Sequence, residues 1–157
     1  MVVNIRAAET RDVAAIIAVG RRTWPATYGF AGPAYVTSGL ATWWSADAIQ
    51  QSIQNTTVMV VEDRTAIVAT GNIDLRGGHP TIWKLYVVPE SQGAGVGSAL
   101  LRTLLGVAGD RPVRLGYLDG NSRAAAFYAA HGFLEIGREP SGEPGWPATV
   151  WVERHPT

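Results

Sequence analysis

The 157-residue sequence contains no cysteine. A chain without thiols forms no disulfide, holds no metal through thiolates and has no cysteine nucleophile. This composition agrees with a reducing compartment, and we predict a cytoplasmic protein.

An excess of charge of either sign is also missing. Lys+Arg and Asp+Glu both number 13, which gives a formal net charge of zero. Nothing in this balance attracts the chain to a nucleic acid or to an anionic membrane surface. We therefore expect no nucleic acid and no membrane as partner, and a small or locally recognised substrate instead.

Long apolar runs are absent as well. Residues 1–11 have no apolar run with a small-residue cleavage site, and nowhere do about 18 apolar residues follow one another. Secretion and membrane spanning are not expected. The three histidines, His79, His131 and His155, lack the spacing of metal ligands, so we expect no metal site.

What is present is the composition of one folded domain. Hydrophobic residues make up 46% of the sequence and charged residues 17%, which leaves no room for a long disordered segment. A domain of this length buries roughly 70% of its unfolded surface. We predict a single domain over residues 1–157.

The first half of the chain has strand signals on both sides of an irregular region. Apolar and β-branched runs predict strands at residues 2–7, 58–61, 66–75 and 81–88, the last three as an antiparallel meander. Thr10, which precedes Arg11, Asp12 and the apolar series Val13, Ile16 and Ile17, is expected to be the N-cap of a helix. Prolines and glycines interrupt residues 24–55, where we expect one regular helix, over residues 45–53.

The second half alternates helices and strands. A helix with leucines on one face opens near Gly95, and a strand follows at residues 113–118. Asn121 caps a second helix to His131, before strands at residues 133–137 and 149–153. The order predicts an α/β (α+β) fold whose mixed, mostly antiparallel sheet of about six to seven strands carries helices on both faces.

Glycine alternates with other residues in the segment Gln92-Gly93-Ala94-Gly95-Val96-Gly97-Ser98, between the strand ending at Val88 and the leucine-rich helix. Glycine lets the backbone approach a bulky anion, and the first N–H groups of the helix point toward that anion. The segment therefore predicts a phosphate-binding turn in which backbone groups matter more than charged side chains.

Other interpretations of this segment are weaker but remain possible from the sequence. A nucleotide P-loop needs Gly-Lys followed by Ser or Thr, whereas Ser98 follows Gly97 directly. A dinucleotide-binding fingerprint would place its last glycine at Leu100, and it normally follows a strand of a parallel βαβ unit. The glycines could also form a turn with no ligand.

Two motifs in sequence order resemble the GNAT superfamily of acetyltransferases. The segment Gln92-x-x-Gly95-x-Gly97 matches that family's acetyl-CoA-binding motif. Residues 121–133 match its second motif, N-x-x-A-x-x-F-Y-x-x-x-G-F. The resemblance implies a GNAT-like fold, acetyl-CoA as cofactor, and transfer of an acetyl group to a primary amine of a small molecule or peptide. A catalytically silent acyl-CoA-binding module is the alternative, and the chain is expected to be a monomer or homodimer.

The resemblance also implies roles for individual residues. The strand before the loop is expected to diverge from the next parallel strand, and backbone groups of Val87 and Val88 would bind the pantetheine arm. Gln92 to Ser98 would hold the pyrophosphate. Asn121 would contact the cofactor, besides capping its helix. Tyr128 would protonate the departing CoA thiolate, which needs only modest tuning of its pKa, although it could also simply pack beside Phe127.

The general base and the acceptor pocket are less defined. Many relatives place an acidic residue on the strand before the loop, but this strand carries Lys84. Glu62 and Asp74 are the candidate bases, although either could be a solvated charge at a strand end. Trp24 and Tyr28 lie in the irregular region that covers the acceptor pocket in similar proteins, and we predict that they contact the substrate.

Overall fold

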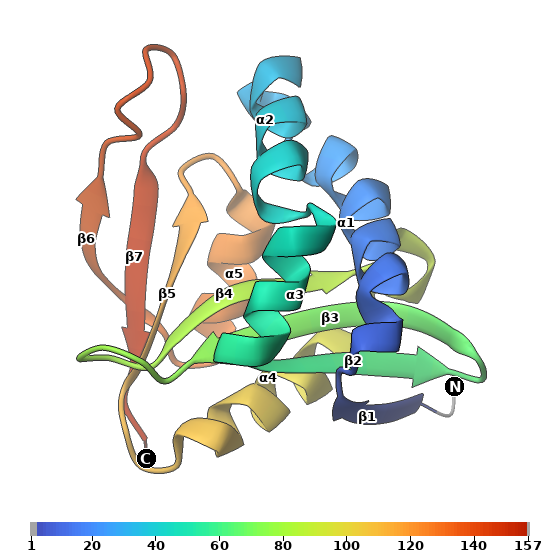
Figure 1. Cartoon of the computed structure of the whole chain (residues 1–157). Helices are drawn as coiled ribbons and strands as arrows, with labels where there is room; N and C mark the ends of the chain where they lie inside the picture. Colours follow the sequence, from blue (N-terminus) through green and yellow to red (C-terminus); the bar gives the residue numbers. More distant parts are fainter. Residues whose placement is uncertain (1–2, 157) are drawn as a thin grey trace.

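The computed structural model describes residues 3–156, so Val2, with which the first predicted strand begins, lies outside the described residues. One mixed sheet forms the centre of the molecule (Figure 1). Its strands are β1 (Val3–Ala7), β2 (Thr57–Asp63), β3 (Ala66–Asp74), β4 (Thr81–Val87), β5 (Val113–Leu118), β6 (Leu134–Glu139) and β7 (Thr149–Arg154).

The seven strands lie in the order β1-β2-β3-β4-β5-β7-β6. Every neighbouring pair is antiparallel except β4 and β5, which are parallel. The predicted mixed, mostly antiparallel sheet is therefore confirmed.

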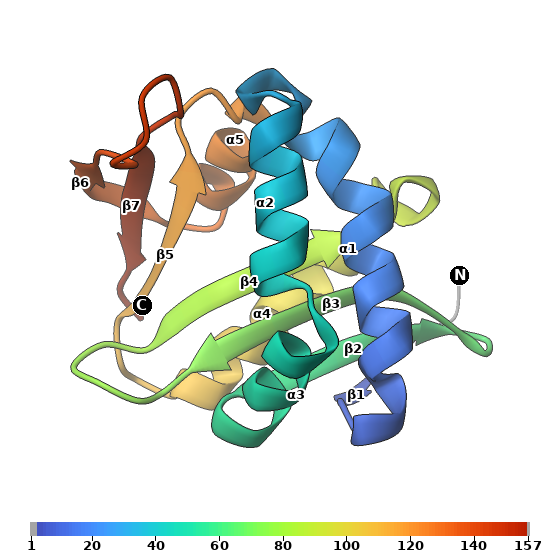
Figure 2. The same ribbon diagram turned by 45° about the horizontal axis from the view of Figure 1, so that its top comes forward.

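Helices cover both faces of the sheet (Figures 1 and 2). On one face lie α1 (Val13–Thr27), α2 (Pro33–Trp43) and α3 (Ala46–Asn55); on the other lie α4 (Val96–Ala108) and α5 (Ser122–Ala130). Short 3-10 turns occupy Thr10–Asp12, Gly29–Ala31 and Pro89–Ser91. Since both faces are covered, residues 68–74 of β3 are all buried, including the polar Thr70, Asn72 and Asp74.

Each face has its own core. The leucines of α4, Leu100, Leu101 and Leu104, pack on one side of the sheet together with Phe133. On the other side, four aromatic residues from α1, α2 and the C-terminal ends of these helices, Trp24, Tyr28, Tyr35 and Trp44, are buried together with aliphatic residues of α1, α3, β2 and β5. Residues of both cores line the site described below.

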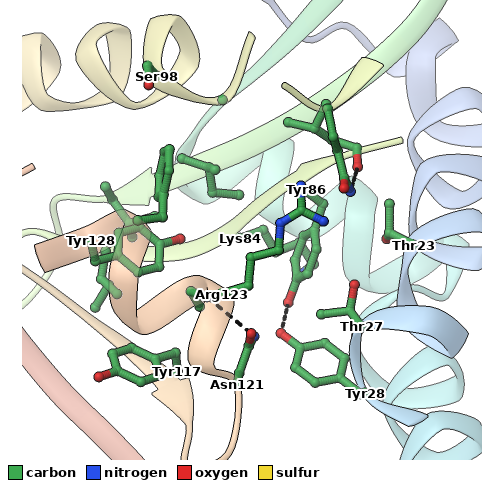
Figure 3. A pocket seen from close by; sticks show the side chains of 18 of the residues that line it. Thr23, Thr27, Tyr28, Lys84, Tyr86, Ser98, Tyr117, Asn121, Arg123 and Tyr128 are labelled. Atoms are coloured by element: carbon green, nitrogen blue, oxygen red, sulfur yellow. Dashed lines mark hydrogen bonds between the residues drawn. The ribbon is translucent and has the colours of Figure 1, made fainter. Parts of the chain in front are cut away.

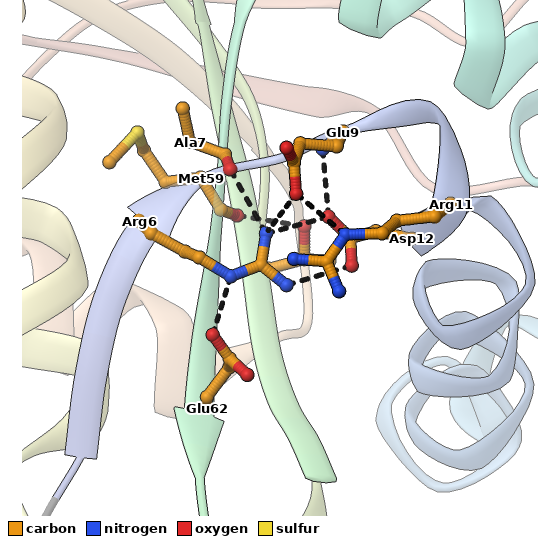
Figure 4. A network of polar contacts seen from close by, with 8 residues as sticks. Arg6, Ala7, Glu9, Arg11, Asp12, Met59 and Glu62 are labelled. Carbon is orange, nitrogen blue, oxygen red and sulfur yellow. Dashed lines mark hydrogen bonds and ion pairs between the residues drawn. The ribbon is translucent and has the colours of Figure 1, made fainter. Parts of the chain in front are cut away.

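The beginning of α1 corrects one prediction. Thr10 is not the helix cap, because it lies inside the 3-10 turn and α1 begins only at Val13. The backbone N–H of Glu9 donates to the Asp12 carboxylate over 2.7 Å. Asp12 also accepts two hydrogen bonds from Arg6 (Figure 4). A carboxylate held by an arginine of β1 thus takes the place of the predicted threonine cap.

Residues 24–55 are more helical than predicted. α1 continues through Pro25 to Thr27, and α2 occupies a stretch in which no helix was expected. Pro33 stands at the first position of α2, where its missing N–H costs nothing. Gly39 lies inside α2 because a Cβ there would come 2.0 Å from the Trp24 ring. These residues were interpreted as breakers, but they serve helix initiation and close packing.

The single parallel pair is incomplete. β4 and β5 are in register only at Thr81 with Arg114 and at Ile82 with Leu115. Beyond these pairs the two strands diverge, which confirms the divergence that the family resemblance implied. The gap between them opens toward the end of β4, where the glycine-rich loop begins (Figure 1).

Candidate acyl-transfer site

A cavity of about 740 Å³ fills the gap between β4 and β5. We call it the loop cavity, because residues of the glycine-rich loop line it; Figure 3 shows other side chains of its wall. Its walls come from α1, β4, β5 and α5, and include Thr23, Tyr28, Lys84, Val87, Tyr117, Asn121, Arg123 and Tyr128. The two matched motifs, far apart in sequence, therefore meet around one space.

The loop presents unpaired N–H groups to this cavity. Among residues 3–156, no acceptor is found for the backbone N–H of Gly93, Ala94 or Gly95. The first intrahelical bond of α4 runs from the Ala99 N–H to the Gly95 carbonyl, so the N–H groups at positions 96–98 are also free. Together they form the donor set that a diphosphate requires.

The glycines make this loop possible. Gly93 has φ +84° and Gly95 has φ +82°, a left-handed conformation that residues with a Cβ rarely adopt. A Cβ added at either position would meet no protein atom within 4 Å. The space in front of these glycines is therefore open to a ligand, as a phosphate-binding turn needs.

Val87 and Val88 differ in whether their backbone groups are available to a ligand. The Val88 N–H donates to the Val68 carbonyl over 2.9 Å, and Val88 does not line the loop cavity. Because opposed residues of an antiparallel pair alternate in their hydrogen bonding, the backbone of Val87 faces the gap instead. Of these two valines, Val87 is the one that lines the cavity, whereas the N–H of Val88 is already used within the sheet.

Side chains at the two ends of the loop fix its position. Gln92 donates to the Val87 carbonyl over 2.9 Å, which ties the loop to the end of β4. His131 contacts the Phe127 carbonyl through Nδ1 and the Ser98 hydroxyl through Nε2. Since a carbonyl only accepts, Nδ1 carries the proton and the Ser98 hydroxyl donates to Nε2. His131 thereby joins α5 to the first turn of α4.

Of four further residues predicted to bind the cofactor, two line the cavity and two do not. Gly97 lines it, whereas Ala94 and Val96 do not contribute side chains to its wall. Val96 is buried in the α4 core. Asn121 lines the cavity and also caps α5, because its Oδ1 accepts from the Ala124 N–H over 3.1 Å. The two roles considered for Asn121 are therefore compatible.

Tyr128 directs its hydroxyl into the loop cavity (Figure 3). Its ring packs against Phe127, Phe133 and Tyr117. Burial raises the pKa of Tyr128 above its usual value of 10.0. The phenol therefore stays protonated at neutral pH, but it is a weaker acid than an ordinary tyrosine, so the shift is opposite to the tuning that proton transfer to a thiolate would favour.

A second cavity, of about 550 Å³, adjoins the first. We call it the aromatic cavity, because nine of the residues that line it are aromatic: Trp24, Tyr28, Tyr35, Trp43, Trp44, Trp83, Tyr86, Tyr117 and Trp151. Tyr28, Lys84, Tyr86 and Tyr117 line both cavities. Both residues predicted to contact substrate, Trp24 and Tyr28, are brought to this second space.

The two carboxylates considered as bases are both engaged elsewhere. Glu62 pairs with Arg6 on the outer strands and lines neither cavity (Figure 4). Asp74 lines the aromatic cavity but binds Arg76 and the Trp83 indole N–H. Mainly through Arg76, the pKa of Asp74 falls to about 2, so its carboxylate is a poor proton acceptor.

Sequence reasoning missed several residues of the cavity walls. Arg123, Thr27 and Tyr117 line the loop cavity, and Tyr35 lines the aromatic cavity. Arg123 lies within the second motif at a position that the motif leaves open, so no sequence signal marked it. Tyr35 belongs to α2, the helix that was not predicted.

Comparison with known proteins agrees with this geometry. The family model described as acetyltransferase (GNAT) domain matches residues 54–135, just over half of the chain. An uncharacterized protein of Mycobacterium leprae, ML0378, is 32% identical over 117 residues, which is 71% of this chain. The chain spans about a third (33%) of the length of that relative.

Solved structures share the whole fold. The PaiA N-acetyltransferase of Thermoplasma acidophilum, solved in complex with coenzyme A, superposes with a TM-score of 0.85 at 20% identity, covering 99% of this chain and 100% of that one. The ribosomal-protein-S18-alanine N-acetyltransferase of Escherichia coli gives a TM-score of 0.78 at 20% identity, covering 98% and 94%. At this identity the likeness concerns the fold.

The mixed sheet with its one diverging parallel pair and the glycine-rich loop thus define a domain of the GNAT type. The chain belongs to the GNAT acetyltransferase family. Within residues 3–156, no helix is long and apolar enough to span a bilayer.

Proposed function

We propose that this chain transfers an acetyl group from acetyl-CoA directly to the primary amine of a small molecule or peptide. The observation that carries the proposal is the set of free N–H groups at positions 93–98, which faces a cavity that continues into a second, aromatic one. The first space suits a diphosphate and an extended arm. The second suits an acceptor.

The residues present fit acetyl-CoA. The N–H groups from Gly93 to Ser98 would hold the pyrophosphate, and the backbone of Val87 would hold the arm in the gap between β4 and β5. Asn121 and Arg123 would contact it from α5. The bound thioester supplies an activated acyl group, so no covalent acyl-enzyme is required.

The remaining chemistry falls to side chains and backbone of the chain. The acceptor would enter through the aromatic cavity, where Trp24 and Tyr28 form part of the wall. The Val87 N–H would polarise the carbonyl that is attacked. Tyr128, protonated at neutral pH, would give its proton to the leaving sulfur. Holding both reactants in adjoining spaces contributes to the rate by orientation.

A thiol-release assay tests this proposal. Purified protein is incubated with acetyl-CoA and a panel of primary amines that includes alkylamines, arylalkylamines and peptides with a free N-terminus. We expect release of CoA that depends on an amine. Gly95→Glu places bulk and a negative charge in front of the free N–H groups, and should abolish both CoA binding, measured by calorimetry, and thiol release.

Two other outcomes would reject the proposal. If the wild type binds acetyl-CoA tightly but no amine elicits thiol release, the chain is a silent acyl-CoA-binding module. The engagement of Glu62 and Asp74 by arginines is the observation that favours this alternative. If NAD raises the melting temperature and CoA does not, the loop binds a dinucleotide.

We also propose that residues 1–157 act as one GNAT-like domain, as a monomer or homodimer in the cytoplasm. The continuous sheet from β1 to β6 supports a single unit. Size-exclusion chromatography with light scattering measures the oligomeric state directly.

A further inference from the structure

Lys84 stands at the junction of the two cavities. It lies on β4, three residues before Val87, and lines both the loop cavity and the aromatic cavity (Figure 3). It is also the only lysine in the sequence, since the other basic side chains counted with it are arginines. The single primary amine side chain of the protein is therefore located where acceptor and acyl group would meet.

No counter-ion of Lys84 is found in the part of the chain that the structure describes. Within residues 3–156, neither a hydrogen bond nor an ion pair joins its Nζ to another residue, and its nearest polar interaction is with the Trp44 ring, 5.1 Å from Nζ to the ring centroid. The other basic residue that lines the aromatic cavity, Arg76, is paired with Asp74. An unpaired, largely desolvated ammonium is costly, which favours the neutral amine.

The titratable groups that share walls with Lys84 come from every surrounding element. The anionic ones are Asp74 of β3 and Glu139 of β6, and the cationic ones are Arg76 and Arg123. The phenols are Tyr28, Tyr35, Tyr86, Tyr117 and Tyr128. Desolvation outweighs their influence and lowers the pKa of Lys84 from 10.5 to about 8. At pH 7 about one Lys84 in ten is then neutral, against about one in 2,500 for an ordinary lysine.

We propose that Lys84 is the general base of the acyl transfer: its neutral Nζ takes a proton from the ammonium group of the acceptor. This inference rests on the proposed function. It assigns to a lysine of β4 the task for which neither Glu62 nor Asp74 is available, because both carboxylates are bound by arginines.

Every proton of the proposed acetyl transfer is accounted for. The acceptor ammonium loses one proton to Nζ of Lys84, and its freed lone pair attacks the acyl carbon. The carbon–sulfur bond breaks, and the sulfur takes a proton from the Tyr128 hydroxyl. The nitrogen that has become an amide loses its second proton, which restores Tyr128 through solvent, and Lys84 releases its own proton to solvent. One amide, one thiol and one proton result.

A direct titration gives the first readout, without any acetyl-CoA. Protein labelled with ¹³C and ¹⁵N only in lysine gives one side-chain amine signal, because Lys84 has no competitor. We expect its chemical shift to titrate with a midpoint near 8. A midpoint above 10 would overturn the assignment, since almost no neutral amine would then exist at neutral pH.

The second readout uses a matched pair of acceptors, 2-phenylethylamine and O-benzylhydroxylamine. They are similar in shape, but only the first is an ammonium ion at pH 7 and needs a base. Lys84→Arg keeps a cation over Trp44 yet accepts no proton, and Lys84→Met keeps the bulk without charge. Both variants should lower kcat/KM for the alkylamine by about 10²–10⁴-fold. The loss should be at least about tenfold smaller for the alkoxyamine.

The outcomes separate the two proposals. A wild type that acetylates neither acceptor nor any amine of the panel would overturn the acyltransferase function and the base together. An active wild type whose Lys84→Arg variant is undiminished, or loses the same factor with both acceptors, would overturn the base alone. Stoichiometric acetylation of Lys84 by acetyl-CoA, detected by mass spectrometry, would make it an acceptor instead and would also overturn the assignment.

Discussion

The hydroxyl groups of Tyr28 and Tyr86 lie 2.8 Å apart, at the boundary between the loop cavity and the aromatic cavity (Figure 3). Tyr28 ends α1 and Tyr86 belongs to β4, so this hydrogen bond joins the helix to the strand that carries Lys84. Burial raises the pKa of both phenols, so both hydroxyls stay protonated and able to share this bond at neutral pH.

A double-mutant cycle tests this contact. Tyr28→Phe and Tyr86→Phe should each lower the free energy of unfolding by about 0.5–1.5 kcal/mol, because each leaves a partly buried hydroxyl without its partner. The double variant should lose less than the sum of the two, with a coupling of about 0.5–1 kcal/mol. Urea unfolding followed by circular dichroism measures all four proteins. Additive losses would mean that the hydroxyl pair contributes nothing as a pair.

The second prediction concerns Gly39 and the Trp24 ring. A methyl group at Gly39 would lie 2.0 Å from the Trp24 ring, so Gly39→Ala should lower the free energy of unfolding by about 1–3 kcal/mol. Trp24 is buried and forms part of the aromatic cavity wall. Displacement of the Trp24 ring should therefore raise the KM for the acceptor. The affinity for acetyl-CoA, measured by calorimetry, should not change.

Gly106→Ala is the matched control for Gly39→Ala. Gly106 also lies inside a helix, α4, but a Cβ there meets no atom within 4 Å. This change should stabilise the protein by about 0.5–1 kcal/mol, because alanine favours the helix. If both alanine variants were equally stable, the close approach of Gly39 to Trp24 would be wrong.

The sequence predicted the loop and its two flanking elements because their signals are local. Gly93 and Gly95 need φ above zero, and the leucine pattern of α4 repeats at helical spacing. The secondary-structure prediction for the region around Trp24 was wrong because the deciding contacts there are not local. Gly39 fits under an indole ring of α1, a contact between two helices that no window of sequence contains.

The same distinction between local and tertiary signals applies to the residues of the site. Residues fixed by a motif, such as Asn121 and Tyr128, were found in the sequence and lie on the loop cavity. The unpaired state of Lys84 depends on burial and on where Arg76 places Asp74, so it emerges only when β3 and β4 are side by side. Arg123 likewise acquires a role only from the position of α5.

The third prediction concerns acid stability and the Arg6–Asp12 pair (Figure 4). The hydrogen bonds from Arg6 lower the pKa of Asp12 from 3.8 to about 2. A depressed carboxyl pKa contributes stability above the unfolded value, and this contribution is lost as the pH falls toward 2. Asp12→Asn should therefore cost about 1–2 kcal/mol at pH 7 and flatten the stability curve between about pH 5 and pH 2.

Asp110→Asn serves as the control for Asp12→Asn. Asp110 is exposed, and no ion pair involves it within the described residues 3–156. Its removal should change the free energy of unfolding by less than about 0.5 kcal/mol at every pH. Equal pH dependence of the Asp12→Asn variant and the wild type would contradict a stabilising role for the Arg6–Asp12 pair.

The fourth prediction compares two alanine substitutions in the loop. Gly95→Ala forces a side chain into φ +82° and should destabilise the fold by about 1–2 kcal/mol. Gly97 is helical, and its Cβ would meet Phe127 at an ordinary 3.6 Å, so Gly97→Ala should fold without strain. Thermal unfolding measures the first effect, and calorimetry with CoA measures what each methyl group does to the binding turn.

The fourth prediction has a clear contrary result. Equal melting temperatures for the two variants would mean that the backbone at Gly95 is not held in the left-handed conformation. Unchanged CoA affinity in both would mean that the ligand does not approach the loop as closely as the free N–H groups require.

The last prediction concerns proton donation by Tyr128. Since burial raises its pKa above 10.0, Tyr128 is protonated throughout the neutral range and adds no ionisation to the pH profile below that value. Tyr128→Phe should lower kcat by about 10²-fold, because thiolate departure loses its acid, while the affinity for CoA stays within a few-fold.

Tyr117 stacks on Tyr128 with ring centroids 6.3 Å apart and lines the same cavity, so Tyr117→Phe is the matched control. It should leave kcat within a few-fold of the wild type. Equal losses in the two variants, or a loss of CoA affinity that accounts for the loss of rate in Tyr128→Phe, would assign Tyr128 to packing, because a proton donor must act on the step in which the carbon–sulfur bond breaks and not on binding.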